Sequence, residues 1–330
     1  MNKIKVFEAF AGYGGASFAL NRADIPHEVI GFSETDKFAD QLYKKNFPDT
    51  KNYGDIKKID PDSLPDFDLF TGGFPCQPFS QVGLGKGEQD TRGTLFHSIL
   101  KICEKKAPKH ILLENVKGLV SKRYRKTLQT IVLKLEKKGY QVTYNLLNSK
   151  DFGIPQNRER VWIYAYKGEL DTNFNLVPKR KKLENHFKDF LDKCPSEDLF
   201  KSQEQIKRLE ELYDLNFVVD EPCCADLYNK KIRKDGLSVT ILEPHHNKMR
   251  VVHPPKDGKL SVRKYSINEH FRFMGFKDGE IDFCNQSYQQ LCKRAANGWD
   301  INIVTLLFEI IFKKKNYEAK EKLHLFQFKG

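Results

Sequence analysis

The chain has 330 residues and a formal net charge of +12, with 56 Lys and Arg against 44 Asp and Glu. Its hydrophobic content of 39% can build one large domain and a smaller one. This basic charge suits a polyanionic partner such as nucleic acid or an anionic membrane. No apolar run approaches the roughly 18 residues of a membrane span, and the N-terminus lacks a signal-peptide core, so we expect a soluble, cytoplasmic protein.

The first half of the chain alternates β-branched runs with amphipathic stretches, which is typical of a mainly parallel sheet covered by helices. The expected strands lie at 3–10, 27–34, 66–73, 110–116, 140–149 and 160–166. The expected helices lie at 16–23, 36–47, 94–106 and 125–139. This order predicts an α/β fold with a doubly wound, Rossmann-like sheet.

The pattern changes after residue 167. Residues 168–260 are charged and irregular apart from a helix-like stretch at 202–212, and they predict a smaller, irregular domain. Helical periodicity returns at 266–276 and at 287–312, where we expect one strong helix that packs back on the first lobe. The first domain is therefore expected to comprise 1–167 and 261–330, with 168–260 inserted into it.

A glycine-rich turn, "FAGYGGAS" at 10–17, follows the first expected strand and opens a helix. Gly12, Gly14 and Gly15 allow a tight turn and a close approach of backbone N–H groups to a ligand. Glu34, at the end of the next strand, is placed to accept both hydroxyls of a ribose, and Asp55 can accept from an adenine amino group. Together they predict an adenosine pocket.

Ser17 occupies the place of the third glycine of a dinucleotide fingerprint, and no phosphate-binding lysine follows it. A cofactor with adenosine but no pyrophosphate, S-adenosylmethionine, is therefore favoured over a nicotinamide dinucleotide.

The chain has seven cysteines, an odd number that argues against a disulfide framework, and no Cys/His spacing predicts a metal site. Cys76 differs from the others because Pro75 and Pro78 stiffen the backbone around it, just past an expected strand. A thiolate there is a good nucleophile.

Glu114 ends the next expected strand, and "QNRER" then supplies Gln156, Arg158 and Arg160. These groups could instead be a helix cap and a surface ion-pair cluster.

Taken in order, "FAGYGG", "PCQPFS", "ENV", "QNRER", "SINEHFRFMGF" and "ANG" resemble the motifs of C5-cytosine DNA methyltransferases of the bacterial and phage restriction-modification type. One motif is altered. The family usually has Gly-Asn, a small residue and Val, whereas Ala296, Asn297, Gly298 and Trp299 stand here.

The resemblance implies transfer of a methyl group from S-adenosylmethionine to carbon 5 of a flipped cytosine, through a covalent Cys76 adduct at carbon 6. Glu114 would donate to N3, Arg160 would contact the base carbonyl or that acid, and Gln156 and Arg158 would support the loop. Phe10, Pro75 and Asn297 would join the glycines, Glu34 and Asp55 in the cofactor site. DNA contacts would come from Ser80, Gln81, Lys86, Arg92 and Thr240.

Three alternatives remain open from the sequence: an RNA cytosine-5 methyltransferase of the same fold, a nicotinamide-dependent oxidoreductase, and an inactive DNA-binding module. The leading interpretation predicts a monomer on double-stranded DNA, with S-adenosylhomocysteine as the product and no need for a metal or a membrane.

Overall fold

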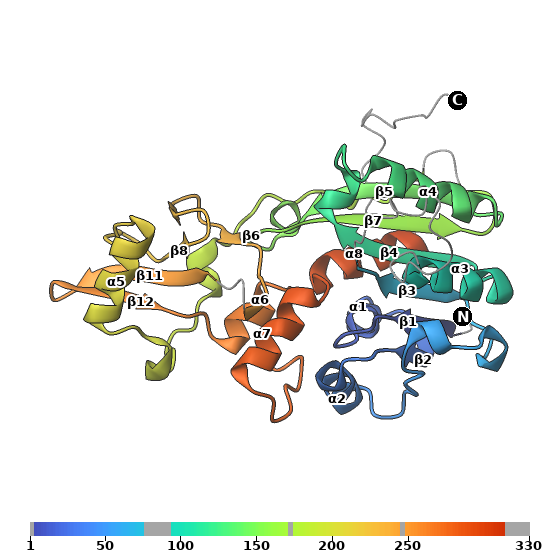
Figure 1. The fold of residues 1–330 in the computed structure, drawn as a ribbon, viewed down its shortest axis with the longest axis horizontal. Helices are drawn as coiled ribbons and strands as arrows, with labels where there is room; N and C mark the ends of the chain where they lie inside the picture. Colours follow the sequence, from blue (N-terminus) through green and yellow to red (C-terminus); the bar gives the residue numbers. More distant parts are fainter. Residues whose placement is uncertain (1–2, 76–93, 171–173, 245–247, 314–330) are drawn as a thin grey trace, which may run out of the picture.

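A computed structural model describes residues 3–75, 94–170, 174–244 and 248–313. Two lobes lie side by side along the long axis of the molecule (Figure 1). The larger lobe contains a six-stranded sheet in the order β2-β1-β3-β4-β7-β5, and the smaller lobe contains a four-stranded sheet.

The six strands of the larger sheet are the six that the sequence predicts. They are β1 (Ile4–Ala9), β2 (His27–Ser33), β3 (Leu69–Gly73), β4 (His110–Val116), β5 (Gln141–Asn148) and β7 (Glu159–Tyr166). The first four run parallel, whereas β7 pairs antiparallel with both β4 and β5. The sheet is therefore mainly parallel, with one reversed strand near its far edge.

Helices cover both faces of this sheet, so the fold is doubly wound. They are α1 (Gly15–Arg22), α2 (Lys37–Asn46), α3 (Thr94–Lys106), α4 (Arg125–Glu136) and α8 (Ile301–Lys313). Successive strand residues point to opposite faces. Ile111 and Leu113 consequently pack with α3 and α4 in one core, while Leu112 packs with α1 and α8 in the other.

The stretch predicted as one helix at 287–312 is two helices, α7 (Tyr288–Asn297) and α8. The break comes at Gly298 to Asp300, where the Asp300 carboxylate accepts from the backbone N–H groups of Asn302 and Ile303 and so begins α8. As expected, α8 packs back on the first lobe, against α1.

Contrary to expectation, Tyr288–Lys313 is apolar and long enough to pass for a membrane span, but 67% of its most apolar window is buried in the fold.

The smaller lobe is more regular than the sequence indicates. Its sheet has the order β12-β11-β8-β9, and every pair of neighbours is antiparallel. The strands are β8 (Cys223–Asp226), β9 (Lys231–Arg233), β11 (Met249–Lys256) and β12 (Lys259–Arg263), with α5 (Gln203–Tyr213) beside them. Ile206, Phe217, Val252 and Val262 help to form a core of their own.

Short elements complete the chain and join the lobes. A parallel bridge links β6 (Gln156–Asn157) to β10 (Ser238–Val239), and α6 (Ile267–Arg272) follows β12. Short 3₁₀ turns lie at η1 (Ile56–Lys58), η2 (Pro61–Ser63), η4 (Lys117–Val120), η5 (Ser149–Phe152), η6 (Phe187–Phe190) and η7 (Glu197–Leu199).

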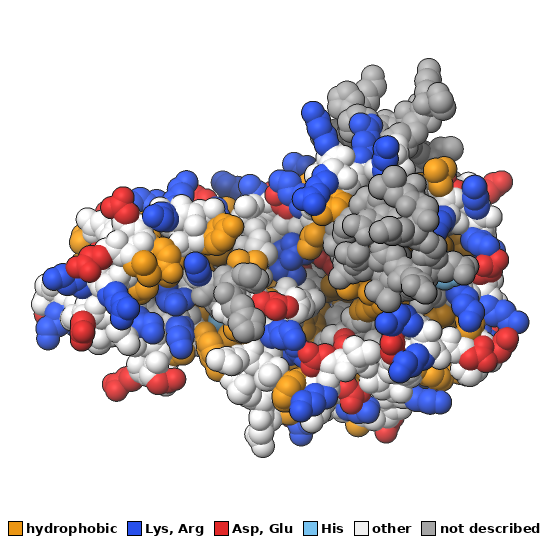
Figure 2. Space-filling view, viewed as in Figure 1, with side chains coloured by type: hydrophobic (Ala, Val, Ile, Leu, Met, Phe, Trp, Pro, Cys, Tyr) orange, Lys and Arg blue, Asp and Glu red, His pale blue; other side chains and the backbone are white. Residues whose placement is uncertain are grey.

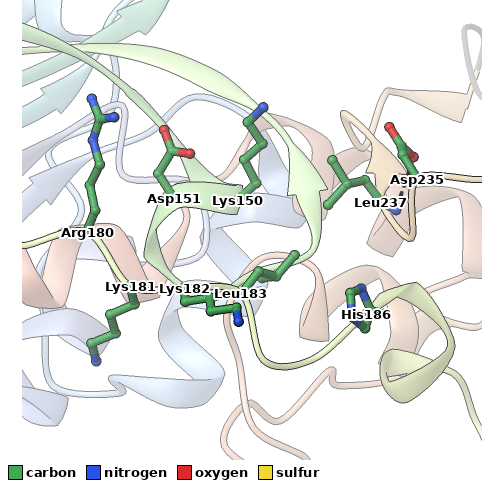
Figure 3. A pocket seen from close by; sticks show the side chains of 9 residues that line it. All are labelled: Lys150, Asp151, Arg180, Lys181, Lys182, Leu183, His186, Asp235 and Leu237. Carbon is green, nitrogen blue, oxygen red and sulfur yellow. Dashed lines mark hydrogen bonds between the residues drawn. The ribbon is translucent and has the colours of Figure 1, made fainter.

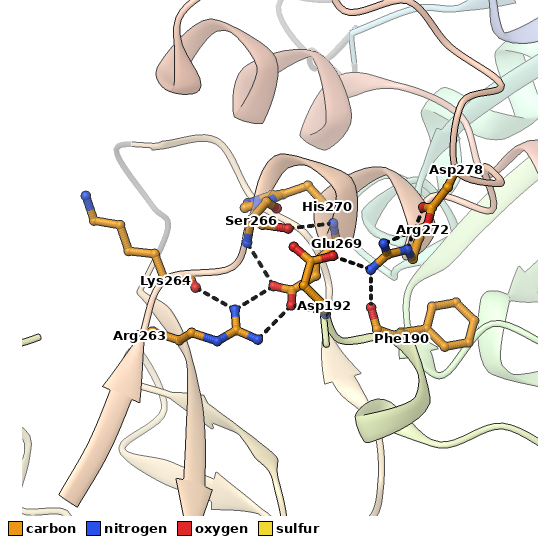
Figure 4. Close-up of polar contacts among 9 residues, drawn as sticks. All are labelled: Phe190, Asp192, Arg263, Lys264, Ser266, Glu269, His270, Arg272 and Asp278. Atoms are coloured by element: carbon orange, nitrogen blue, oxygen red, sulfur yellow. Dashed lines mark hydrogen bonds and ion pairs between the residues drawn. The ribbon is translucent and has the colours of Figure 1, made fainter. Parts of the chain in front are cut away.

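One fully buried ion pair, called here the junction pair, connects the end of β12 to α6 (Figure 4). Two guanidinium nitrogens of Arg263 donate to the Glu269 carboxylate, at 2.7 and 2.8 Å. Glu269 also accepts from the backbone N–H groups of Asp192 and Ser266. The remaining Arg263 nitrogen, Nε, donates to Nε2 of His253 at 3.0 Å, so this histidine is engaged inside the protein.

Candidate active site

The glycine turn after β1 has an unusual backbone. Phe10, Gly12 and Gly14 have φ angles of 53°, 58° and 90°, and Gly14 is the N-cap of α1. Only glycine adopts this left-handed region at little cost, so Phe10 is held there against its preference. The turn places the N-terminus of α1 at the carboxyl edge of the parallel strands, where ligands bind in such sheets.

Glu34 follows β2 and lies beside this turn. Its carboxylate accepts from the Gly12 N–H at 3.0 Å and from the N–H groups of Thr35 and Asp36 at 2.8 Å. Asn52 donates to the backbone carbonyl of Glu34 at 3.1 Å. The structure therefore brings together two of the residues predicted to bind the cofactor, and it fixes Glu34 next to the turn.

Asp55 lies in the loop after Asn52. Its carboxylate caps η1 by accepting from the Lys57 N–H at 3.0 Å, and it faces the Lys57 ammonium at 3.7 Å. The preceding residue, Gly54, is bonded through its carbonyl to the Ser33 hydroxyl at the end of β2. Asp55 is thus held close to the edge that carries Glu34.

Ser17, where a third glycine was expected, contributes a hydrogen bond. Its hydroxyl and that of Tyr43 both donate to the buried carboxyl of Glu8 in β1. Burial raises the pKa of the Glu8 carboxyl, and these donors oppose the rise. Sequence reasoning did not assign Glu8 to the site, although a buried acid inside a strand that precedes a glycine turn is a signal for one.

A small cavity of about 30 Å³ opens between the turn and the end of β3. Phe10, Gly12, Gly15, Gly73, Asn297 and Trp299 are among its lining residues. A Cβ atom on Gly15 would lie 3.2 Å from Trp299, and one on Gly73 would lie 2.8 Å from the indole nitrogen, so both glycines make room for this ring. Asn297 lines the same cavity and donates to Glu243.

Glu114 and Arg160 form the ionic centre of the site. They face one another across β4 and β7, with Arg160 Nε 2.9 Å from Glu114 Oε1. The Arg160 side chain is 17% exposed and the Glu114 side chain is 13% exposed. Burial raises the pKa of the Glu114 carboxyl, although Arg160 and Arg158 act in the opposite direction. The other carboxylate oxygen, Oε2, lies 3.2 Å from the point where a Cβ on Gly73 would be.

Gln156 and Arg158 are committed to backbone groups. The Arg158 guanidinium donates to the carbonyls of Ala296 and Gly298 at 3.1 and 2.8 Å. The Gln156 amide donates to the Phe273 carbonyl and accepts from the Ile241 N–H. Burial lowers the pKa of Arg158 to about 9. These two side chains tie the "QNRER" segment to the small lobe and to the turn that carries Trp299.

Thr240 lies on the small lobe next to a cavity of about 300 Å³. Its hydroxyl donates to the carbonyl of Asn157 at 2.7 Å. Arg233, Lys248 and Tyr228 line the same cavity, and Tyr228 is 72% exposed. Thr240, which the sequence predicts to contact DNA, is therefore anchored to "QNRER" and borders an open, partly basic surface.

Five of the predicted residues, Cys76, Ser80, Gln81, Lys86 and Arg92, lie outside the described residues. On the N-terminal side of Cys76, the last described residue is Pro75, which is exposed. The amide of Asn115 in β4 donates to the Phe74 carbonyl at 2.8 Å and so holds the chain two residues before Cys76. The "ENV" motif thus contributes a second residue, which the sequence analysis did not single out.

Lysine and arginine side chains are spread over both lobes on the face shown in Figure 2. A larger cavity, of about 500 Å³, lies apart from the ionic centre, where η5 meets the small lobe (Figure 3). Lys150, Arg180, Lys181 and Lys182 line it, together with His186 and Asp235. It shares no lining residue with the cavity beside Trp299.

Residues 4–313 match the family model of the C-5 cytosine-specific DNA methylases. The chain is 32% identical to the Type II methyltransferase M2.ScrFI of Lactococcus lactis subsp. cremoris, over 94% of this chain and 100% of that one. It is 44% identical to M1.ScrFI of the same organism, over 52% of this chain and 44% of the relative.

The fold is similar to that of a DNMT2 variant from Spodoptera frugiperda, with a TM-score of 0.74 and 18% identity, over 94% of this chain and 100% of that one. The family match covers the glycine turn, the Glu114–Arg160 pair and the segment around Trp299 alike. The chain belongs to the C-5 cytosine-specific DNA methylase family.

Proposed function

We propose that this methylase transfers the methyl group of S-adenosylmethionine to carbon 5 of a flipped cytosine in duplex DNA, through a covalent bond between Cys76 and carbon 6. One observation carries the proposal. Glu114 is a largely buried carboxyl with a raised pKa, and it faces Arg160. It also lies beside Gly73, and Gly73 comes three residues before Cys76 in the chain. Family membership favours methyl transfer over the nicotinamide-dependent alternative.

The residues at the edge of β1 and β2 fit S-adenosylmethionine. Glu34 presents a carboxylate next to the glycine turn, as a ribose requires, and a Cβ on Gly12 would meet nothing within 4 Å, so the turn is open there. The site offers no lysine for a pyrophosphate among its described lining residues. Phe10, Gly14, Gly15, Glu34, Asp55, Pro75 and Asn297 would hold the cofactor, which supplies an electrophilic methyl group when bound.

The protein groups activate the cytosine. Addition of the Cys76 thiolate to carbon 6 breaks the 5,6 double bond and moves electron density toward N3, where the protonated Glu114 donates its proton. Arg160 stabilises the base carbonyl and orients Glu114. Carbon 5 then has the nucleophilic character that it lacks in free cytosine. A base then takes the proton from the methylated carbon 5, and N3 returns its proton to Glu114. The 5,6 double bond re-forms and the Cys76 thiolate is released.

Carbon 6 is inaccessible inside a duplex, so the cytosine must leave the base stack, at a cost of a few kcal/mol. We place the duplex between the lobes, with residues 168–260 as the recognition domain and Thr240 at its inner edge. Arg233 and Lys248, which line the cavity beside Thr240, are suited to phosphate contacts. Ser80, Gln81, Lys86 and Arg92 would close over the extruded base. The enzyme acts as a monomer, without a metal, in a restriction-modification setting.

The test is a methyl-transfer assay with tritiated cofactor on duplex DNA and on RNA. We expect transfer to DNA, and we expect Cys76→Ala to abolish it while cofactor binding, measured by calorimetry, persists. Cys103→Ala is the matched control, because that cysteine belongs to α3 and is buried in the core between this helix and the sheet. Transfer by Cys76→Ala at a comparable rate, or transfer to RNA alone, would overturn the proposal.

A further inference from the structure

Trp299 stands where the family pattern has valine, and it is almost fully buried, with 9% of its surface exposed. Its indole lies between Gly15 and Gly73, at the carboxyl edge of the sheet. Ring carbons lie near the start of α1, at Gly15, and the indole nitrogen lies near the end of β3, at Gly73. This places one large aromatic ring across the cavity between the glycine turn and the Glu114 carboxyl.

The ring is held in place from several sides. Trp162 in β7 packs edge-on against it, with ring centroids 5.1 Å apart and an interplanar angle of 74°. The Tyr13 hydroxyl donates to the backbone carbonyl of Trp299, and a Cβ on Gly298 would collide with the Tyr13 ring. Arg158 fixes the same turn through the carbonyl of Gly298. A ring so constrained has a defined orientation toward the cavity before any ligand binds.

The lining of this cavity offers a ligand cation few carboxylate partners. Glu8 is the only carboxylate among the described residues that line it, and Ser17 and Tyr43 already donate to this group. Tryptophan attracts cations more strongly than the other aromatic side chains, so the Trp299 indole in the lining would add to the attraction of this cavity for a ligand cation.

We propose that Trp299 is a cofactor-selecting residue, whose indole recognises the positive sulfonium of S-adenosylmethionine and makes the site prefer it over the uncharged thioether product, S-adenosylhomocysteine. This inference rests on the proposed function, because it presupposes that the methyl donor binds beside the glycine turn. Its consequence is kinetic: S-adenosylmethionine competes with the product more effectively than it would in a cavity walled by valine, so product inhibition is weakened.

The binding test compares three ligands on the full chain by calorimetry: S-adenosylmethionine, S-adenosylhomocysteine, and sinefungin, whose amine carries the charge in place of the sulfonium. For Trp299→Leu we expect the dissociation constants of the two charged ligands to rise about tenfold, and that of S-adenosylhomocysteine to change less than about twofold. Trp299→Phe keeps an aromatic ring and should retain most of the preference for the charged ligands over S-adenosylhomocysteine. Trp162→Phe, which changes only the packing partner, keeps it.

A fluorescence readout is independent of these affinities. Trp162 and Trp299 are the only tryptophans in the chain, so in Trp162→Phe all indole emission comes from Trp299. We expect this emission to change as S-adenosylmethionine saturates the site.

Equal weakening of all three ligands by Trp299→Leu would reduce Trp299 to a steric wall and overturn the inference, as would an unchanged emission at saturation. In both cases the unaltered protein would still bind S-adenosylmethionine and the proposed function would stand. If the unaltered protein binds none, both ideas fail.

Discussion

Two of the arginine–glutamate pairs among the described residues differ in how completely their hydrogen-bonding groups are satisfied. In the junction pair, between the lobes, neither side chain is exposed, and Glu269 accepts from Arg263 twice and from two backbone N–H groups. In the active-site pair, Glu114 contacts Arg160 through one oxygen, and both side chains retain some exposure. Among the described residues, no other hydrogen-bond partner of Glu114 is recorded.

The difference separates structural from chemical use of the same residue types. A buried carboxylate with four donors has no capacity left for a ligand, and its cost of burial is offset by its partners. Among the described residues only Arg160 pairs with the Glu114 carboxyl, and burial raises the pKa of this group because Arg160 and Arg158 offset the desolvation only in part. Residual bonding capacity at a largely buried acid therefore marks the functional pair more reliably than burial or charge alone.

The largest expected effect is at the active-site pair, where Glu114→Gln should lower the rate of methyl transfer. Loss of a general acid costs about 10²- to 10⁴-fold, and glutamine fills the same space without a transferable proton. Single-turnover methyl transfer should fall by that factor, with cofactor affinity unchanged. A rate within about threefold of the unaltered enzyme would remove Glu114 from the mechanism.

The second effect is on stability, at the other pair. Glu269→Gln leaves the Arg263 guanidinium charged and uncompensated where no water reaches it, at an expected cost of about 3–5 kcal/mol in the free energy of unfolding. Urea denaturation measures it. The control is Asp278→Asn, which removes the exposed partner of Arg272 and is expected to cost about 1 kcal/mol or less. Similar losses in the two variants would show that the junction pair is not special.

A smaller effect is expected on the pH dependence of the methyl-transfer rate, which reports the pKa of Glu114. Since Glu114 must be protonated to donate, the rate should fall as pH rises through its raised pKa. Arg160 opposes that rise, so Arg160→Gln should raise the pKa further and move the alkaline limb of the single-turnover rate to higher pH, in addition to slowing the reaction. Lys117→Gln, in an exposed pair with Glu159, should leave the limb in place. Movement to lower pH in Arg160→Gln would contradict the assigned role of Glu114.

Sequence reasoning succeeded where the information is local. Strands such as β4 contain a run of apolar residues, Ile111 to Leu113, and each covering helix has its own period, so both can be recognised without knowledge of their partners. Glu34 and Glu114 lie at one sheet edge because parallel strands end there together, and Arg160 lies at the same edge because the antiparallel strand β7 begins there. The glycine turn was predicted for the same reason.

Long-range features could not be predicted in this way. The small-lobe sheet is made of short strands such as β9, which holds the residues Lys-Ile-Arg and acquires its register only from β8. Glu269 resembles an ordinary capping residue, because its partner Arg263 lies at the end of another element. The motif predicts that Gln156 and Arg158 support the loop, but it does not reveal their partners, which are backbone groups in distant segments.

The most direct test of the covalent mechanism is capture of the enzyme on DNA. Bisulfite sequencing of DNA from cells that express the protein gives the target sequence, and a duplex with 5-fluorocytosine at that cytosine is then incubated with enzyme and S-adenosylmethionine. Fluorine at carbon 5 cannot leave as a proton does, so we predict a stable adduct that peptide mapping locates at Cys76. An adduct on another residue, or none with an enzyme that methylates the ordinary duplex, would contradict the mechanism.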